Sequence, residues 1–287
     1  MGSWNQDPLV IATLLLAGGL YARGVATVWR RGGTGTLVSR AQVVCYAAGL
    51  YVLAIALLSP LDALAHVLFS AHMVQHVLLM LIAAPLLVLG APLLPFLWGL
   101  PRGPRLALGR GLASRPSLGR AWHALTGPVV VWCILTGTLW LWHLPTLYQA
   151  AVRYPLVHLL EHATMLGASL LFWWVVLQPA GRRRINGGVA VLLVFTTKMQ
   201  SATLGALITF TPNPLYPVYE AGATAWGMTL LQDQHLAGLI MGTVSGLAFL
   251  VAGSLAFLSW LRVMERSARP PGSVPAQAPI RGPRLEL

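Results

Sequence analysis

Apolar runs long enough to cross a lipid bilayer recur along this chain, separated by short segments that carry arginine. A helix needs about 20 mostly apolar residues to span the hydrocarbon layer. Charged residues make up only 9% of the 287 residues and apolar residues make up 56%, a composition that no water-facing surface would have. We therefore expect an all-α, polytopic membrane protein.

Seven such runs can be placed along the sequence. They predict a seven-transmembrane-helix bundle over residues 1–266, followed by a disordered cytoplasmic tail, rich in Pro and Arg, over residues 267–287. The expected spans cover residues 8–28, 41–58, 66–92, 128–147, 155–178, 187–210 and 236–261.

Arginines are concentrated in every second gap between the expected spans. This alternation places the N-terminus outside and the C-terminus in the cytoplasm. It also argues against nucleic acid as a partner, despite the formal net charge of +12, because no folded basic domain carries the arginines. Membrane lipid is the expected surrounding. The basic gaps contain Arg30, Arg31 and Arg40; Arg102, Arg105, Arg110, Arg115 and Arg120; Arg182, Arg183 and Arg184; and Arg262, Arg266 and Arg269.

The segment around the third span is apolar for longer than one crossing requires. It extends from Leu61 to Leu100 and contains several prolines, including Pro85, Pro92 and Pro95. Two crossings would place the next arginine-rich gap on the wrong side. We therefore expect one crossing, with the prolines bending its inner end into an interfacial extension.

The third and fifth expected helices both carry histidine pairs at helical spacing. His72 and His76 are one turn apart, and His158, Glu161 and His162 fall within one wedge of the fifth helix. In the expected orientation, both pairs lie in the outer half of the membrane. Imidazoles with a carboxylate alongside them suit a metal ion. We therefore predict a metal site between these helices.

Three further residues complete the predicted ligand set. They are His143 at the end of the fourth span, Met73 on the third and Asp233 at the outer end of the seventh. A single intramembrane histidine can also be a hydrogen-bonding contact between helices. His66, His143 and His235, each taken alone, therefore remain ambiguous.

The sulfur-containing residues carry a weaker signal. Met73, Met80 and Met165 lie near the histidines, but methionine is a common gap-filler, so packing is the favoured interpretation. Cys45 and Cys133 lie in separate apolar segments without a CxxC motif. Neither a disulfide framework nor a thiolate metal site is indicated.

The last two expected helices contain features of helix packing. Lys198, near the middle of the sixth span, must face the bundle interior or a wet cavity, and Glu161 is its expected partner. Such a buried pair can serve only to set helix register. Gly238, Gly242 and Gly246 form a small-xxx-small ladder, which predicts close approach of a neighbouring helix.

Several ordered motifs resemble the seven-helix CtaG family of bacterial cytochrome c oxidase assembly factors. They are HMVQHVLLMLIAAPLLVLGAP, LWHLP, HLLEH, MQSATLGALITFTPNPLYPVY and DQHLAGLIM, spread over most of Arg40 to Leu261. The resemblance implies a plasma-membrane protein that serves the maturation of haem–copper oxidases, through delivery or insertion of copper. The family pattern is matched at His72, His76, His143, His158, Glu161, His162 and Asp233, whereas His235 and Gly242 depart from it.

The leading prediction is a non-enzymatic assembly factor that holds copper near the outer surface and passes it to subunits of cytochrome c oxidase. A haem protein is an alternative, with His72 or His76 opposite His158 or His162 as axial ligands. A metal-free scaffold that docks oxidase subunits is another. A copper channel is less favoured, because the cytoplasmic side offers only His123, and a hydrolase is disfavoured because no serine accompanies a histidine and a carboxylate in a strained turn.

Overall fold

The computed structural model describes residues 4–177 and 185–268. Within these ranges the chain consists of helices and connecting loops, without a β-strand, which confirms the all-α class. The predicted disordered tail falls almost wholly outside the described residues. Its first two positions belong instead to the last helix, which ends at Ala268.

The α-helices are α1 (Pro8–Gly32), α2 (Arg40–Leu58), α3 (Pro60–Ala65), α4 (Phe69–Val77), α5 (Ala84–Leu89), α6 (Leu93–Gly99), α7 (Arg102–Ala113), α8 (Pro116–Leu125), α9 (Pro128–Trp142), α10 (Pro145–Arg153), α11 (Pro155–Leu177), α12 (Gly187–Phe210), α13 (Glu220–Ala225), α14 (Leu230–Leu239) and α15 (Ser245–Ala268). Two π-helical turns, η1 (Leu78–Ala83) and η3 (Ile240–Val244), join α4 to α5 and α14 to α15, and a 3₁₀ turn, η2 (Pro217–Tyr219), precedes α13.

Six helical stretches in the described part of the chain are long and apolar enough to cross a membrane. A seventh crossing requires two helices together, because α9 has only 15 residues and α8 is bent from it by 63°. The expected fourth span is therefore the one that the structure supports least directly. The six stretches are Pro8–Gly32, Arg40–Leu58, Phe69–Leu89, Pro155–Leu177, Gly187–Phe210 and Leu230–Val251.

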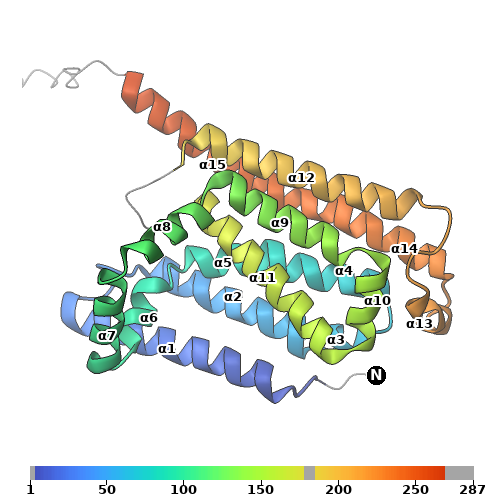
Figure 1. Ribbon diagram of the computed structural model, residues 1–287, viewed down its shortest axis with the longest axis horizontal. Coiled ribbons are helices and arrows are strands. Elements are labelled where there is room, and N and C mark those ends of the chain that lie inside the picture. Colours follow the sequence, from blue (N-terminus) through green and yellow to red (C-terminus); the bar gives the residue numbers. More distant parts are fainter. Residues whose placement is uncertain (1–3, 178–184, 269–287) are drawn as a thin grey trace, which may run out of the picture.

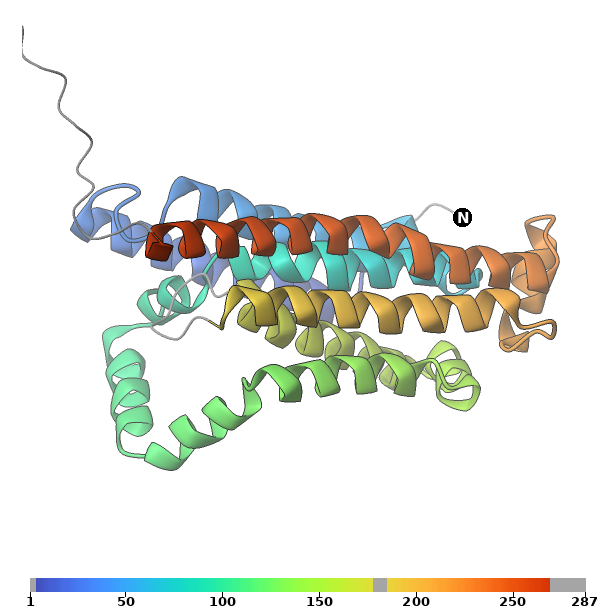
Figure 2. The ribbon, with the colours of Figure 1, turned by 90° about the horizontal axis from the view of Figure 1, so that it is seen from above.

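The long helices lie side by side as one elongated bundle with two distinct ends (Figure 1). The short helices α3, α10 and α13 gather at one end. Helices α7 and α8 lie at the other end and project from the bundle as an arm (Figure 2). The arm carries arginines, including Arg102 and Arg110 of α7 and Arg120 of α8, together with His123. The histidines that were predicted to form the site lie towards the opposite end of the bundle, on or next to α4, α9 and α11.

The apolar segment around the third span crosses the bundle once and then turns, as predicted. Its continuous part ends at Leu89, and the following helix α6 packs against α1. The backbones come close enough that a Cβ atom on Gly24 would collide with the carbonyl group of Pro95. A glycine at this position therefore permits the contact between α1 and the turned segment.

The π-helical turn η1 lies just before Pro85. The N–H of Ala84 donates to the carbonyl of Leu79, five residues earlier. In the same pattern Pro85 would donate to the carbonyl of Met80, but proline has no N–H. Two side chains of α11 satisfy that carbonyl instead, since Ser169 Oγ donates to it at 2.8 Å and Trp173 Nε1 at 2.9 Å. The proline thus both interrupts the helix and ties it to α11.

Helix α12 makes the close glycine contact that the seventh-helix ladder predicted, with α14 at Gly238 and with η3 at Gly242. A Cβ atom on Gly205 would lie 2.8 Å from the carbonyl oxygen of Gly238. At Gly242 a Cβ atom would meet nothing within 4 Å, and at Gly246 it would meet the side chain of Lys198. The same Cβ atom on Gly205 would lie 2.8 Å from the backbone nitrogen of Gly242, so the close backbone approach involves both Gly238 and Gly242.

Candidate metal centre

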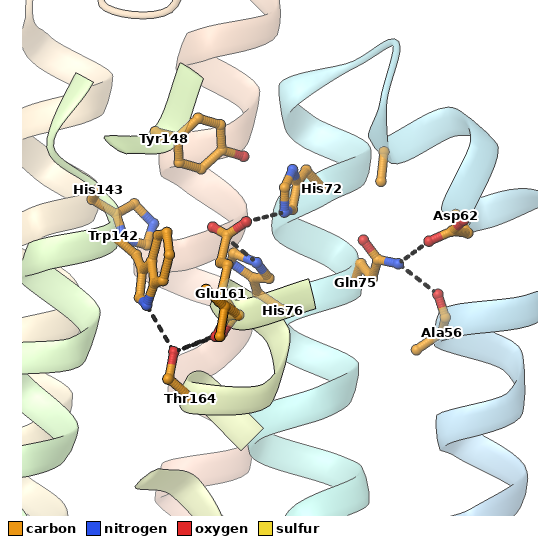
Figure 3. A network of polar contacts seen from close by, with 12 residues as sticks. Ala56, Asp62, His72, Gln75, His76, Trp142, His143, Tyr148, Glu161 and Thr164 are labelled. Carbon is orange, nitrogen blue, oxygen red and sulfur yellow. Dashed lines mark hydrogen bonds and ion pairs between the residues drawn. The ribbon is translucent and has the colours of Figure 1, made fainter. Parts of the chain in front are cut away.

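Six histidines and one glutamate converge at the α3 and α10 end of the bundle. Figure 3 shows three of the histidines, His72, His76 and His143, around Glu161. The histidine rings contact one another in a chain, with centroid distances from 4.1 Å for His158 and His162 to 6.2 Å for His76 and His143. The rows predicted on the third and fifth spans therefore face each other. The seven residues are His66 after α3, His72 and His76 on α4, His143 after α9, and His158, Glu161 and His162 on α11.

Helix α4 is held in place at its N-terminus by a residue from a distant helix. Leu68, the residue before α4, makes no capping side-chain hydrogen bond. Asp233 of α14 replaces the local cap, because its carboxylate accepts hydrogen bonds from the backbone N–H groups of Phe69 at 2.7 Å and Ser70 at 3.1 Å. A carboxylate at a helix N-terminus also interacts favourably with the helix dipole. Asp233 thereby sets the position of His72, one turn further along.

Glu161 lies at the centre of the cluster. Its Oε2 atom is 3.6 Å from Nε2 of His72, and its Oε1 atom is 3.6 Å from Nε2 of His76. The side chain is fully buried, and neither oxygen has a hydrogen-bond partner among the described residues. A buried carboxylate without hydrogen bonds is costly unless a positive charge compensates it.

The imidazoles around Glu161 share this lack of partners. Buried polar atoms without a hydrogen-bond partner are rare in folded proteins, and each one requires an explanation. Here the residues that carry them lie beside Glu161 or line the two adjoining cavities. The atoms are Nε2 of His72, both ring nitrogens of His76, Nε2 of His143, Nε2 of His158, Nε2 of His162 and both oxygens of Glu161.

Four of these residues have the spacing of a coordination sphere. One ligand atom from each of His72, His158, Glu161 and His162 lies within 4.8 Å of the others. Three imidazoles and a carboxylate suit first-row transition metals such as copper and zinc. The residues present therefore fit a metal ion on the chemistry of the donor set and on their unpartnered atoms.

In two of the histidines, Nδ1 makes a hydrogen bond, which fixes the ring orientation and leaves Nε2 without a partner. Nδ1 of His143 lies 2.7 Å from the carbonyl oxygen of Leu139, so Nδ1 carries the proton and Nε2 keeps its lone pair. Nδ1 of His72 lies 2.9 Å from the hydroxyl of Tyr219, which in turn donates to the carbonyl of Ala65 at 3.2 Å. Metal-binding histidines are commonly oriented in this way.

Three tyrosines and Phe69 cover the cluster towards the end of the bundle. Tyr148, on α10, has its ring centroid 5.1 Å from that of His72, and its hydroxyl is 3.3 Å from that of Tyr219. Tyr216 donates to the carbonyl of His143 at 2.8 Å. Burial raises the pKa values of all three tyrosines, so they remain protonated donors. Sequence reasoning missed them, because Tyr216 and Tyr219 lie in a loop without periodicity.

The cluster opens on one side through a polar cavity of about 450 Å³. His66 and His158 line it, and their exposure decreases inward, since His66 is exposed, His158 is partly buried and His162 is buried. Asp7 and Asp62 also line the cavity. We refer to this cavity as the vestibule.

Asp62 is held rigidly at the wall of the vestibule. Its two oxygens accept hydrogen bonds from Asn5 Nδ2 at 2.7 Å and from Gln75 Nε2 at 2.8 Å. Gln75 Nε2 also donates to the carbonyl of Ala56 at 2.8 Å, as Figure 3 shows. This network joins the N-terminal segment, α2, α3 and α4 around the vestibule.

Several predicted residues lie elsewhere or have other partners. The expected ion pair between Lys198 and Glu161 is wrong, because Nζ of Lys198 donates to the carbonyl of Gly242 and to Ser245 Oγ, on the neighbouring last helix. Asp233, predicted as a ligand, is fully engaged as the cap of α4 and is absent from the four-residue ligand group. Met73 is buried next to the cluster and lines a second cavity, together with His76.

His235, His66 and the two cysteines lie outside the four-residue ligand group. Among the described residues, His235 makes no ring contact with the cluster histidines, and it is only partly buried. His66, which sequence reasoning left ambiguous, has its ring 4.7 Å from that of His158. Cys45 and Cys133 are both free.

Comparison with known proteins adds family relationships. The family model described as cytochrome c oxidase caa3 assembly factor matches residues 19–263. An uncharacterized protein of Mycobacterium leprae is 26% identical over 274 residues, a match that covers 92% of this chain and 40% of the relative. Uncharacterized proteins of Mycobacterium bovis and Mycobacterium tuberculosis are 27% identical over 278 residues, with the same coverage. The chain thus spans about 40% of the length of these relatives. No solved structure matches it.

Proposed function

Because the chain belongs to the CtaG family of cytochrome c oxidase caa3 assembly factors, we propose that it holds copper at the histidine–glutamate cluster and delivers it to a haem–copper oxidase. In this proposal the role is non-enzymatic. The cluster binds the ion transiently, and an oxidase subunit takes it up. The protein lies in the bacterial plasma membrane, with the cluster near the outer surface.

The observation that carries the proposal is the convergence of unpartnered ligand atoms. Six residues, on α4, on α11 and at the end of α9, carry eight buried nitrogen and oxygen atoms that have no hydrogen bond among the described residues. His66 lines the route to them, with its ring 4.7 Å from that of His158. A fold that used these residues only for helix contacts would pair those atoms with one another, since an unpaired buried polar atom costs about 1 to 3 kcal/mol. A bound cation would compensate one atom from each of His72, His158, Glu161 and His162.

The vestibule supports a transfer function in addition to binding. His66, His158 and His162 form a series of imidazoles from exposed to buried, with neighbouring rings 4.7 Å and 4.1 Å apart. An ion can pass along such a series by exchanging one ligand at a time. The carboxylates of Asp7 and Asp62 favour a cation in the vestibule. An oxidase subunit that docks over the vestibule would therefore reach the ion through His66.

Two alternatives receive less support. A haem with two axial histidines needs a slot between the ligands that is wide enough for a porphyrin, whereas here the imidazoles pack edge against face and Glu161 lies between them. A scaffold without metal would leave the unpartnered atoms of the cluster without an explanation.

Metal analysis of detergent-purified protein tests the binding step. We expect copper loaded into the wild-type protein to be retained through gel filtration, and the copper content to fall by more than half in His72→Ala, His158→Ala, His162→Ala and Glu161→Gln. His235→Ala is the matched control, because this histidine lies outside the cluster and should leave copper content unchanged. Equal copper content in all five variants would remove the site.

Complementation tests the delivery step. A deletion strain that carries the His162→Ala variant should assemble oxidase with haem but with a reduced copper signal in its spectrum, and added copper should restore activity in part. Full activity of that variant without added copper, at wild-type expression, would refute delivery through the cluster. Loss of assembled oxidase subunits that copper does not restore would support the scaffold instead.

A further inference from the structure

A second cavity adjoins the cluster on the side away from the vestibule. It has a volume of about 50 Å³ and lies between α4, η1, α9, α11, α12 and the last helix. His76 and His143 line it at the cluster, and Met73, Met80 and Met241 line it beyond. We refer to it as the methionine cavity. The series His72, His76 and Met80 follows one face of α4 and η1, so the methionine cavity continues the cluster along the bundle.

Met73, Met80 and Met241 belong to the hydrophobic core, where methionine usually fills gaps, but here they leave a cavity between them and their neighbours. Their side chains are nearly fully buried, with 1% of Met73, 8% of Met80 and 5% of Met241 exposed, yet they border a cavity. Protein interiors leave few spaces larger than a water molecule. The methionine cavity therefore persists although flexible thioether side chains line it.

Two of the three methionines lie in π-helical turns. Met80 is in η1 and Met241 is in η3. Their carbonyl groups accept hydrogen bonds from side chains, Ser169 and Trp173 for Met80, Ser201 and Ser245 for Met241. π-Helical turns are rare and occur frequently at functional sites, where they redirect side chains. Both residues lie in such turns and line the same cavity, which favours a common function for them.

Polar atoms in the wall of the methionine cavity also lack partners. Thr197 Oγ1 is buried without a hydrogen bond among the described residues, and so are both ring nitrogens of His76. His76 lines the methionine cavity and also lies 3.6 Å from Glu161. This one imidazole therefore connects the two sites.

We propose that the methionine cavity is a second metal site, selective for a soft monovalent ion such as Cu(I), with Met73, Met80 and Met241 as thioether ligands and His76 shared with the histidine–glutamate cluster. The inference rests on the proposed function in that the cluster supplies the ion. Thioethers bind soft ions and discriminate against Zn(II), whereas imidazole and carboxylate accept both. A cavity of this size holds an ion or one or two waters, and no larger ligand. A cuprous ion could then move between the sites through His76 without leaving the protein.

Anaerobic binding of Ag(I) and of Zn(II) to the purified full chain tests the proposal. Ag(I) serves as a redox-inert substitute for Cu(I). Bound metal is measured by mass spectrometry after gel filtration, and the coordination of Ag(I) by X-ray absorption. We expect the wild type to bind one more equivalent of Ag(I) than of Zn(II), with sulfur scattering around silver.

The informative variant is the triple substitution Met73→Leu, Met80→Leu and Met241→Leu, which nearly conserves volume. It should lose the additional Ag(I) equivalent and the sulfur scattering while it keeps Zn(II). Met165→Leu is the control, because Met165 is equally buried but does not line the methionine cavity. Gel-filtration profiles verify folding, and the single Met80→Leu variant substitutes for the triple one if that fails to fold.

The outcomes separate the two proposals. Unchanged Ag(I) binding in a folded methionine variant, or silver surrounded only by nitrogen and oxygen, would overturn the thioether site. If His158→Ala and Glu161→Gln leave Zn(II) and copper binding unchanged, the metal site at the histidine–glutamate cluster is refuted instead. Loss of silver in the methionine variant would then still support the thioether site.

Discussion

At the scale of one residue, Glu161 suits a metal site but lowers the stability of the metal-free fold. It is fully buried on α11, 3.6 Å from two imidazoles, and its oxygens have no hydrogen bonds among the described residues. Removing one member of a paired charge usually destabilises a protein, whereas removing an uncompensated buried charge relieves a cost. The sequence placed Glu161 correctly on the histidine face of the fifth span, but assigned it the wrong partner.

Glu161→Gln should therefore have opposite effects on stability and on binding. We expect the metal-free variant to melt at the same temperature as the metal-free wild type or above it, because the amide carries no charge. Copper should raise the melting temperature of the wild type but not that of the variant. Glu220→Gln, at an exposed position, is the control that should change neither. A variant that melts well below the wild type without metal would contradict this account.

Tyr219 shows a residue role that only the tertiary structure revealed. Its hydroxyl accepts from Nδ1 of His72 at 2.9 Å and so directs Nε2 towards Glu161. We expect Tyr219→Phe to weaken copper affinity by about 10 to 100 fold, as is typical when the residue that orients a ligand is lost. Competition with a chelator of known affinity measures the change.

The control for this substitution is Tyr216→Phe. Tyr216 also donates a buried hydrogen bond, but to the carbonyl of His143 and not to a ring nitrogen. Both variants should lose similar stability, and only Tyr219→Phe should lose much affinity. Equal affinity losses in the two would indicate a general packing effect.

At the scale of elements, the position of α4 depends on a cap from outside its own sequence. Asp233 is fully buried and caps α4 from 164 residues away in the chain. Helices α2 and α14 have local capping boxes, formed by Ser39 with Gln42 and by Thr229 with Gln232. Local signals could predict where those two helices begin, but not what holds α4.

Asp233→Asn should destabilise the fold by about 1 to 3 kcal/mol, because a charge-assisted cap is weakened and a buried amide is left with imperfect partners. It should also reduce copper binding, since His72 and His76 lie on α4. Ser39→Ala, at the local cap of α2, should also destabilise the fold but leave copper binding unchanged, because Ser39 lines neither cavity. Thermal unfolding in detergent and metal content measure both effects. Wild-type copper binding in a folded Asp233→Asn protein would show that the cap does not position the ligands.

The breaks within the long helices belong to the same scale. Pro85 made a bend predictable, because its missing N–H must interrupt the ladder. The π-helical form of the break and the hydrogen bonds from Ser169 and Trp173 depend on α11 lying alongside. The second π-helical turn, at Met241, has no proline to signal it in the sequence.

At the scale of the whole molecule, the arginines and the histidine–glutamate cluster lie at opposite ends of the bundle. Arginine-bearing α7 and α8 lie at one end, and the histidine–glutamate cluster and its vestibule lie at the other (Figure 1). Positive residues near transmembrane ends favour the cytoplasmic side. The proposed delivery of copper to an oxidase requires this orientation, because it places the vestibule outside.

Labelling of single cysteines in a chain without Cys45 and Cys133 tests the orientation. Arg153→Cys, at the exposed end of α10, should react with a membrane-impermeant maleimide on intact cells. Arg110→Cys, exposed on α7, should react only after permeabilisation. The reverse pattern would place the vestibule in the cytoplasm and would rule out delivery to the outer surface.

The sequence by itself determined the features that repeat locally. Apolar length predicted six of the spans, and helical spacing placed His72 with His76, and His158 with Glu161 and His162, on shared faces. The tertiary structure alone decided which faces meet, that Asp233 caps α4, that Tyr219 orients His72 and that Lys198 pairs with the last helix instead of with Glu161. The physical reason is range: helix periodicity is set by residues three or four apart, whereas these contacts depend on how whole helices pack across the bundle.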